Sequence, residues 1–227
     1  SEMIRRRFPA ILEKCRECGY DLTDEIPVAP AAHYSVGGIL SNSNGKTDVK
    51  RLYTCGEVSA TGIMGANRLA SNSLIECLVF ASRAVEDSVR VGEIAEFPEF
   101  EKRYMKDPDN AGLYVAIRNE VAELMNRCAG IIRTDKTLTE GLASLDMLAA
   151  RLDDMEKEMH EYHIEAARRL ISVARLIMEP ALMRKESRGG HYREDYPCAD
   201  EDFVLHSVQQ KGHPISTAPV NAGYFEF

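Results

Sequence analysis

The sequence lacks the features that mark exported, membrane-spanning and nucleic-acid-binding proteins. No apolar stretch is long enough to cross a bilayer, and the arginines at positions 5–7 are not followed by the apolar core of a signal peptide. Basic residues number 28 against 36 acidic ones, a formal charge of −8, so no basic surface for nucleic acid is expected. We therefore predict a soluble, cytoplasmic protein that binds neither nucleic acid nor a membrane.

Two further absences concern cysteine and glycine patterns. The chain has six cysteines in 227 residues, which is not the density of a disulfide scaffold. Cys15 and Cys18 form a lone C-x-x-C motif with no partner pair at zinc spacing, so we expect no metal site. A helix over Ile4–Cys18, capped by Gly19, is the simpler interpretation. The G-x-G-x-x-G loop that cradles dinucleotide phosphates is also absent.

Short apolar runs dominate residues 26–64, and a longer helical pattern follows them. We expect strands at 34–40 and 51–55, with the Asn-Gly pair at 44–45 as the turn of a hairpin. From Ser71 to about Arg90 the spacing predicts an amphipathic helix. Its apolar face is formed by Leu74, Cys77, Leu78, Ala81 and Val85.

Residues 112–182 are almost entirely helical in pattern and carry three apolar seams. One runs from Leu138 through Leu142, Leu145, Leu148, Leu152 and Met155 to Met159; the others comprise Ile117, Val121, Leu124 and Cys128, and Ile164, Ala167, Leu170, Ile171, Ala174 and Ile177. Short connections favour antiparallel neighbours. The sequence therefore predicts a mainly α fold, with a three-helix bundle preceded by a short α/β segment. A tail without periodicity follows from residue 186, and its last part, residues 211–227, is expected to be loop or edge strand.

The segment between the predicted strands and the first long helix holds the residues suited to chemistry. Glu57 would provide a carboxylate at a strand end for sugar or polyol hydroxyls. A helix beginning near Asn72 or Ser73 would favour negative charge at its N-terminus. Arg68 offers a planar fork for a carboxylate, and His33, beside two glycines that allow close backbone approach, adds a donor. The blander alternative is an exposed glutamate and a core histidine.

Three motifs give these residues a family resemblance. They are PVAPAAHYSVGGI, TDVKRLYTCGEVSATGIMGANRLASNSLIECLVF and ESRGGHYREDYP. In this order and spacing they resemble the succinate dehydrogenase/fumarate reductase flavoprotein family, and within it the branch that oxidises L-aspartate. The resemblance covers nearly the whole chain but only the C-terminal part of the family. We therefore expect a fragment that lacks the N-terminal FAD-binding portion.

The resemblance implies roles for individual residues. His33 and Arg68 would bind the substrate carboxylates, with a possible electrostatic role for Arg68. Glu57 would bond hydroxyls of FAD, and Ser73 and Leu74 would face the flavin pyrimidine edge, where a helix N-terminus stabilises negative charge. The substrate would be a small dicarboxylate. L-aspartate would transfer a hydride from C2 to the flavin and become iminoaspartate, with oxygen or fumarate as final acceptor, in the first step of NAD biosynthesis. A quinolinate synthase is a candidate partner.

The resemblance also divides the chain. Residues 1–25 would end a capping domain, 26–92 would be the last segment of the FAD-binding domain, 93–185 the helical bundle and 186–227 the tail. Without the upstream portion we expect the chain to be inactive, not to retain FAD, and to be loosely ordered over 26–92. In the tail, we expect Arg188, His191, Arg193, Glu194 and Asp195 to form paired contacts at a domain interface, the alternatives being an active-site mouth or a solvated loop.

Two other identities stay open at this point. A flavoprotein subunit of succinate dehydrogenase or fumarate reductase would need an iron–sulfur partner, and its covalent-flavin histidine would lie upstream of this sequence. A free-standing helical interaction module would make residues 112–182 the functional part, and the three ordered motifs argue against it.

Overall fold

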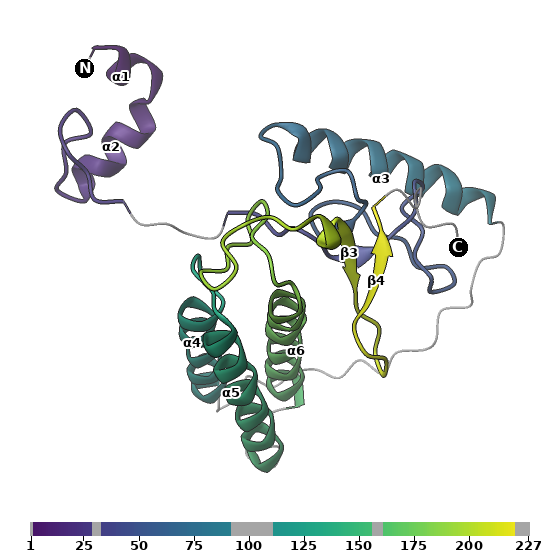
Figure 1. Cartoon of the computed structure of the whole chain (residues 1–227). Helices are drawn as coiled ribbons and strands as arrows, with labels where there is room; N and C mark the ends of the chain where they lie inside the picture. Colours follow the sequence, from purple (N-terminus) through teal and green to yellow (C-terminus); the bar gives the residue numbers. More distant parts are fainter. Residues whose placement is uncertain (1, 29–32, 92–110, 156–160, 221–227) are drawn as a thin grey trace. The chain divides into compact units, whose positions relative to one another are not determined.

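The computed structural model describes residues 2–28, 33–91, 111–155 and 161–220. They fall into two compact units, Ser1–Ser35 and Val36–Phe227. In the first unit, helix α1 (Glu2–Arg7) and helix α2 (Pro9–Glu17) replace the single predicted helix (Figure 1). The break comes because proline starts α2 at its first position, where its missing N–H costs nothing. Gly19 caps α2 as expected, with φ +82°.

The second unit begins with a small parallel sheet. Strand β1 (Ile39–Leu40) pairs with strand β2 (Ser59–Ala60), so the strand predicted over 34–40 is reduced to its last two residues. The predicted strand at 51–55 is wrong, because this stretch makes only an isolated antiparallel bridge between Lys46 and Tyr53. The Asn-Gly turn does form, with the Gly45 N–H donating to the Asn42 carbonyl at 3.0 Å, but it does not join two strands.

Helix α3 (Asn72–Arg90) begins where the sequence predicts it, yet it buries a different face. The buried residues are Glu76, Phe80 and Ala84, which face the loop region before the helix; an added Cβ on Gly45 would lie 3.2 Å from the Ala84 side chain. Of the predicted apolar face, Leu74, Leu78 and Val85 are exposed, and Cys77 and Ala81 are half-buried. Amphipathic spacing identifies an apolar stripe but does not state what covers it, and within the described residues this stripe is open.

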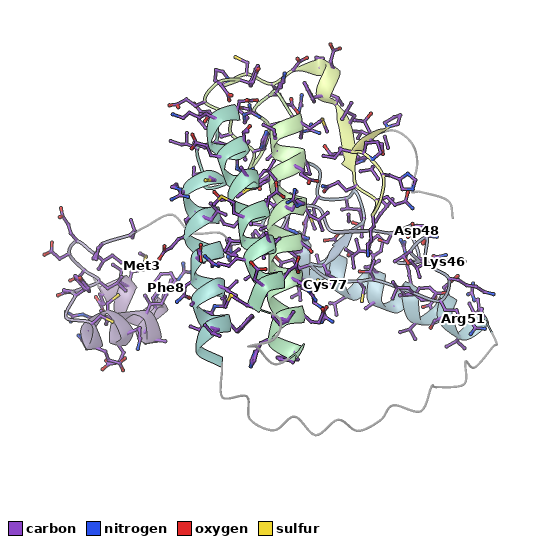
Figure 2. The ribbon with its side chains drawn as sticks, turned by 90° about the horizontal axis from the view of Figure 1, so that it is seen from below. Met3, Phe8, Lys46, Asp48, Arg51 and Cys77 are labelled. Carbon is purple, nitrogen blue, oxygen red and sulfur yellow. The ribbon has the colours of Figure 1, made fainter. Side chains whose placement is uncertain are left out.

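Helices α4 (Ala111–Cys128), α5 (Asp135–Asp154) and α6 (Glu161–Met183) lie side by side as the predicted three-helix bundle (Figures 1 and 2). Helix α5 starts with a capping box, in which Thr134 and Thr137 satisfy each other's backbone N–H groups. The seams form one core, whose buried members are Ile117, Val121, Leu124, Cys128, Ala129, Leu138, Leu145, Leu148, Leu152, Ile164, Ala167, Ile171, Ala174, Met178 and Ala181.

Two positions of the bundle differ from the sequence prediction or extend it. Ile177 is exposed, and Met178 takes its place in the core, because α6 continues its buried stripe with a step of four after Ala174. Met159, the last residue of the α5 seam, lies outside the described residues. Gly141 lets the helices approach closely, since a Cβ there would lie 2.8 Å from the Cys128 Cβ.

The tail carries more regular structure than expected. After a 3-10 turn, η2 (Glu201–Phe203), strands β3 (Leu205–Val208) and β4 (Ser216–Pro219) form an antiparallel pair with His206 opposite Ala218. The prediction of a loop or edge strand over residues 211–227 is confirmed at β4, whereas strand β3 was not predicted. Among the described helices, none has the length and apolar character needed to span a membrane.

Candidate functional site

The segment from Gly56 to Ser71, which includes β2 and leads into α3, carries Arg68 and has a special backbone conformation at each end. Ser59 bonds back to the Gly56 carbonyl through both its N–H, at 3.0 Å, and its hydroxyl, at 2.6 Å. Glu57 lies inside this turn and precedes β2, so the predicted position at a strand end is wrong. At the other end of the loop, Ser71 adopts a left-handed conformation with φ 74° and makes no side-chain cap to α3. The first turn of α3 thus has no N-cap side chain bonded to its N–H groups.

Arg68 is buried and held by an ion pair. Its Nη1 lies 2.9 Å from Oε2 of Glu76, and each side chain is only 2% exposed. The same Nη1 is 3.5 Å from the Ser73 hydroxyl, and Nη2 donates to the Glu57 backbone carbonyl at 3.4 Å. The structure therefore brings Arg68, Ser73 and Glu57 together, although Glu57 contributes its carbonyl to this contact.

Glu76 is a site residue that the sequence interpretation missed. Its Oε1 accepts a hydrogen bond from the Thr61 hydroxyl, while Oε2 takes Arg68, so both oxygens are engaged. The available signal was a single carboxylate inside an apolar run over residues 74–80. A buried carboxylate needs a cationic or hydrogen-bonding partner, and Arg68 lies eight residues upstream.

The remaining predicted residues have different settings. His33 belongs to the first compact unit and is exposed, with its ring 4.1 Å from that of Tyr34. Its meeting with Arg68 stays a prediction. Gly38, with φ +146°, does permit a close approach, but to this chain itself: a Cβ there would lie 2.2 Å from the Val58 carbonyl oxygen. Leu74 is 70% exposed at the start of α3.

The charged tail motif forms a paired cluster at the C-terminal end of α6. Arg193 is fully buried, and its Nη1 donates to the carbonyls of Ala181, at 2.9 Å, and Leu182, at 3.1 Å. These are carbonyls that the helix end leaves without partners. Asp195 accepts two bonds of 2.8 Å from the same guanidinium, and this pairing lowers the pKa of its carboxyl to about 2.

His191 links the cluster to the bundle. Its Nδ1 lies 3.1 Å from Nη1 of Arg133, and its Nε2 lies 3.2 Å from the Arg184 carbonyl oxygen. Because a guanidinium only donates, Nδ1 must accept and Nε2 must carry the proton. Burial lowers the pKa of His191, with nearby arginines acting in the same direction. The ring is thus held neutral.

The tail also contacts the Arg68 loop. The Gly190 N–H donates to the Ala66 carbonyl at 3.2 Å, and Gly189, with φ +59°, lies so close that a Cβ would be 2.1 Å from the same oxygen. The Glu194 N–H donates to the Arg133 carbonyl at 2.9 Å. This motif therefore bonds both to the loop before α3 and to the bundle. Its place at a domain interface stays a prediction.

Comparison with known proteins places these features in a family. A family model described as the fumarate reductase flavoprotein C-terminus matches residues 118–226, and an FAD binding domain model matches residues 1–74. Among solved structures, Escherichia coli quinol fumarate reductase FrdA has a TM-score of 0.78 at 28% identity, over 98% of this chain and 43% of its own. The Mycobacterium smegmatis Sdh1 complex gives 0.75 at 26% identity, over 100% and 43%.

The chain therefore belongs to the succinate dehydrogenase/fumarate reductase flavoprotein family. Its curated relatives include the L-aspartate oxidase of Acinetobacter baylyi, 35% identical over 97% of this chain, and that of Vibrio cholerae, 38% identical over 87%. The chain spans about two fifths of their length, 42% and 38% respectively.

Proposed function

We propose that this chain supplies the carboxylate-binding arginine and part of the FAD site of an enzyme that oxidises L-aspartate to iminoaspartate. The observation that carries the proposal is its 35% identity, along 97% of its length, to an enzyme named L-aspartate oxidase. All five predicted site residues fall inside the match to the FAD binding domain, residues 1–74. Oxygen or fumarate would be the final electron acceptor.

The residues before and at the start of α3 fit the proposed cofactor. With no side-chain cap from Ser71, N–H groups of the first helical turn near Ser73 and Leu74 suit the electron-rich pyrimidine edge of a flavin. Glu57 would accept hydrogen bonds from hydroxyls of the cofactor's ribityl or ribose chain. When bound, FAD supplies the acceptor for the hydride that leaves C2 of the substrate.

The chain's own part in the reaction is orientation of the substrate. Arg68 would bind one substrate carboxylate as a charge-assisted pair, and His33 would donate to a carboxylate as well. Two anchored carboxylates restrict how the carbon between them can turn, and such alignment is a large part of catalysis by proximity. The partial positive charge of the α3 N-terminus would stabilise negative charge that develops nearby.

A second candidate is the flavoprotein subunit of a succinate dehydrogenase or fumarate reductase. The TM-score of 0.78 to quinol fumarate reductase favours it. Because both candidates bind dicarboxylates, Arg68 would have the same role in each, and the substrate distinguishes them.

The test joins this chain to the upstream portion of the Acinetobacter baylyi L-aspartate oxidase. The purified, FAD-loaded fusion is mixed without oxygen with L-aspartate or with succinate, and loss of the visible flavin absorbance is followed. We expect reduction by L-aspartate, abolished in Arg68→Ala and retained in Arg90→Ala, a matched change at an exposed arginine of α3. Reduction by succinate alone would support the second candidate. Retention of FAD with no reduction by either would contradict both.

We also propose that this reaction is the first step of NAD biosynthesis, in the cytoplasm, and that a quinolinate synthase consumes the iminoaspartate. The names of the curated relatives support the oxidation of L-aspartate that this role requires. The fusion should then restore growth without nicotinate to a bacterium deleted for L-aspartate oxidase, and Arg68→Ala should not.

A further inference from the structure

We propose that Glu76 is a positioning residue for Arg68, and that Thr61 positions Glu76 in turn. In this arrangement the side chains of Thr61 and Glu76 set the plane of the Arg68 guanidinium before substrate arrives. The inference rests on the proposed function, because it assigns Arg68 to a substrate carboxylate.

A chain of hydrogen bonds connects the end of strand β2 to Arg68. Thr61 directly follows β2 and is buried, and its hydroxyl donates to Oε1 of Glu76. The opposite oxygen, Oε2, holds Nη1 of Arg68 at 2.9 Å. Glu76 itself stands in the second turn of α3, on the buried face. A regular helix and a strand end thus fix the carboxylate, and the carboxylate holds an arginine from an irregular loop.

Stability alone does not account for a pair of this kind. Removing two charges from water costs more free energy than forming an ion pair at the surface. Apolar side chains of similar volume can often replace a buried ion pair without loss of stability. The exposed pair between Arg151 and Glu120, at 50% and 47% exposure, carries no such cost. A buried pair does, however, restrict the rotamers of a long flexible side chain, and a restrained arginine loses less entropy when it binds a carboxylate.

Hydrogen-bond geometry gives the restraint a direction. Glu76 engages Nη1, the Ser73 hydroxyl is 3.5 Å from the same nitrogen, and the Glu57 carbonyl accepts from Nη2. Three hydrogen-bond acceptors around the planar guanidinium determine its orientation. A single acceptor would leave the guanidinium free to rotate about that hydrogen bond. The resulting pre-orientation is a binding effect, so its loss should raise KM more than it lowers kcat.

The experiment uses the fusion protein described above, with three variants of the network and one control. Glu76→Gln keeps the shape but removes the charge, Thr61→Val removes the hydroxyl, and Thr61→Ser keeps it. Glu120→Gln makes the same chemical change in an exposed ion pair of the bundle. For each variant we would measure FAD content, thermal unfolding, and KM and kcat for L-aspartate.

We expect KM to rise about tenfold in Glu76→Gln, the effect of losing one charge-assisted bond, with a much smaller change in kcat. Thr61→Val should raise KM less, with FAD content and thermal unfolding close to those of the unmodified fusion. Thr61→Ser should restore KM, and Glu120→Gln should not change it. A purely structural pair would instead lower the unfolding temperature and FAD content while KM stayed the same in the molecules that retain FAD.

The outcomes separate the two proposals. If the unmodified fusion is not reduced by L-aspartate, the proposed function fails and removes the premise of the inference. If it is reduced, but Glu76→Gln and Thr61→Val both keep the original KM, the positioning role is overturned and the function stands. Should Glu76→Gln lose its FAD, Thr61→Val against Thr61→Ser decides, because neither change alters a charge.

Discussion

At the scale of single residues, the tail histidine shows how a neutral ring is maintained among arginines. His191 lies between Arg133 and the Arg184 carbonyl, and protonation of Nδ1 would turn the acceptor for Arg133 into a second donor. Arg193 adds to the positive surroundings. Burial lowers the pKa of His191 most, the hydrogen bond to the Arg184 carbonyl acts against this, and the nearby guanidinium groups lower the pKa further. The free energy of unfolding must therefore depend on pH through this ring.

The direction of that dependence follows from linkage. The pKa of His191 is lowered from its ordinary 6.5, so its stabilising effect is fully present above about pH 6.5 and is lost as the pH falls below that value. We expect the urea midpoint to fall more between pH 7.5 and pH 5.5 in the original chain than in His191→Gln. His213→Gln, at an exposed histidine, is the control. Equal pH dependence in all three proteins would show that His191 is not held neutral.

Glu57 and Arg68 show what residue types alone can predict. Arg68 was proposed as a site residue because it stands among small residues before a helix, and the structure shows that it is buried. Its partner Glu76 was not identified, since nothing in the spacing states that a helix residue and a loop residue meet. Glu57 was expected at a strand end, but it precedes β2 and its carbonyl contacts Arg68. The role of its carboxylate stays a prediction. The sequence states which chemical groups are present, but which side chains form an ion pair depends on the path of the loop.

At the scale of elements, the two glycines of the tail motif offer a matched pair of substitutions. Gly189 has φ +59° and no room for a Cβ beside the Ala66 carbonyl oxygen, whereas a Cβ on Gly190 would meet nothing within 4 Å. We expect Gly189→Ala to lower the free energy of unfolding by about 1–3 kcal/mol, through strain and displacement of the turn. Gly190→Ala should change it by less than about 0.5 kcal/mol.

Chemical unfolding of the purified chain measures both values. Hydrogen exchange adds a local readout, because the amide of residue 190 donates to Ala66. Its exchange should accelerate in Gly189→Ala only. If both variants behave alike, the tail does not hold the loop that carries Arg68.

The helices were predicted with different success for physical reasons. Each bundle helix has two others to pack against, so its apolar seam matches its buried face, apart from the exchange of Ile177 for Met178. Helix α3 has one described contact surface, formed by the loops at Gly45 and Thr61. It buries Phe80 there and exposes Leu78, opposite to the expectation. An apolar stripe predicts burial only where a partner is present.

At the scale of the whole molecule, we expect the 227-residue chain by itself not to retain FAD. Leu74, Ile75 and Leu78 near the start of α3 are each at least 60% exposed, so the region around the proposed cofactor contacts has uncovered apolar surface. The bundle has a continuous core of its own and should fold. Purified chain should show helical circular dichroism without visible flavin absorbance, while the fusion shows both. One FAD per isolated chain would mean that the cofactor site is complete without further residues.

The expectation that residues 26–92 are loosely ordered belongs to the same scale and stays a prediction. Hydrogen exchange of the isolated chain addresses it, since a loosely ordered segment exchanges its amides faster than the bundle does.

By itself, the sequence determined the elements whose cause is local or periodic. The three bundle helices follow from apolar residues repeated at steps of three and four, the end of α2 from Gly19, and the start of α3 from the change in pattern near Asn72. Motif order was enough to indicate the family. Only the tertiary structure decided that β1 pairs with β2, which face of α3 is buried, and that Arg68 meets Glu76. These features depend on contacts between segments, and local propensity and spacing carry no information on which segments meet.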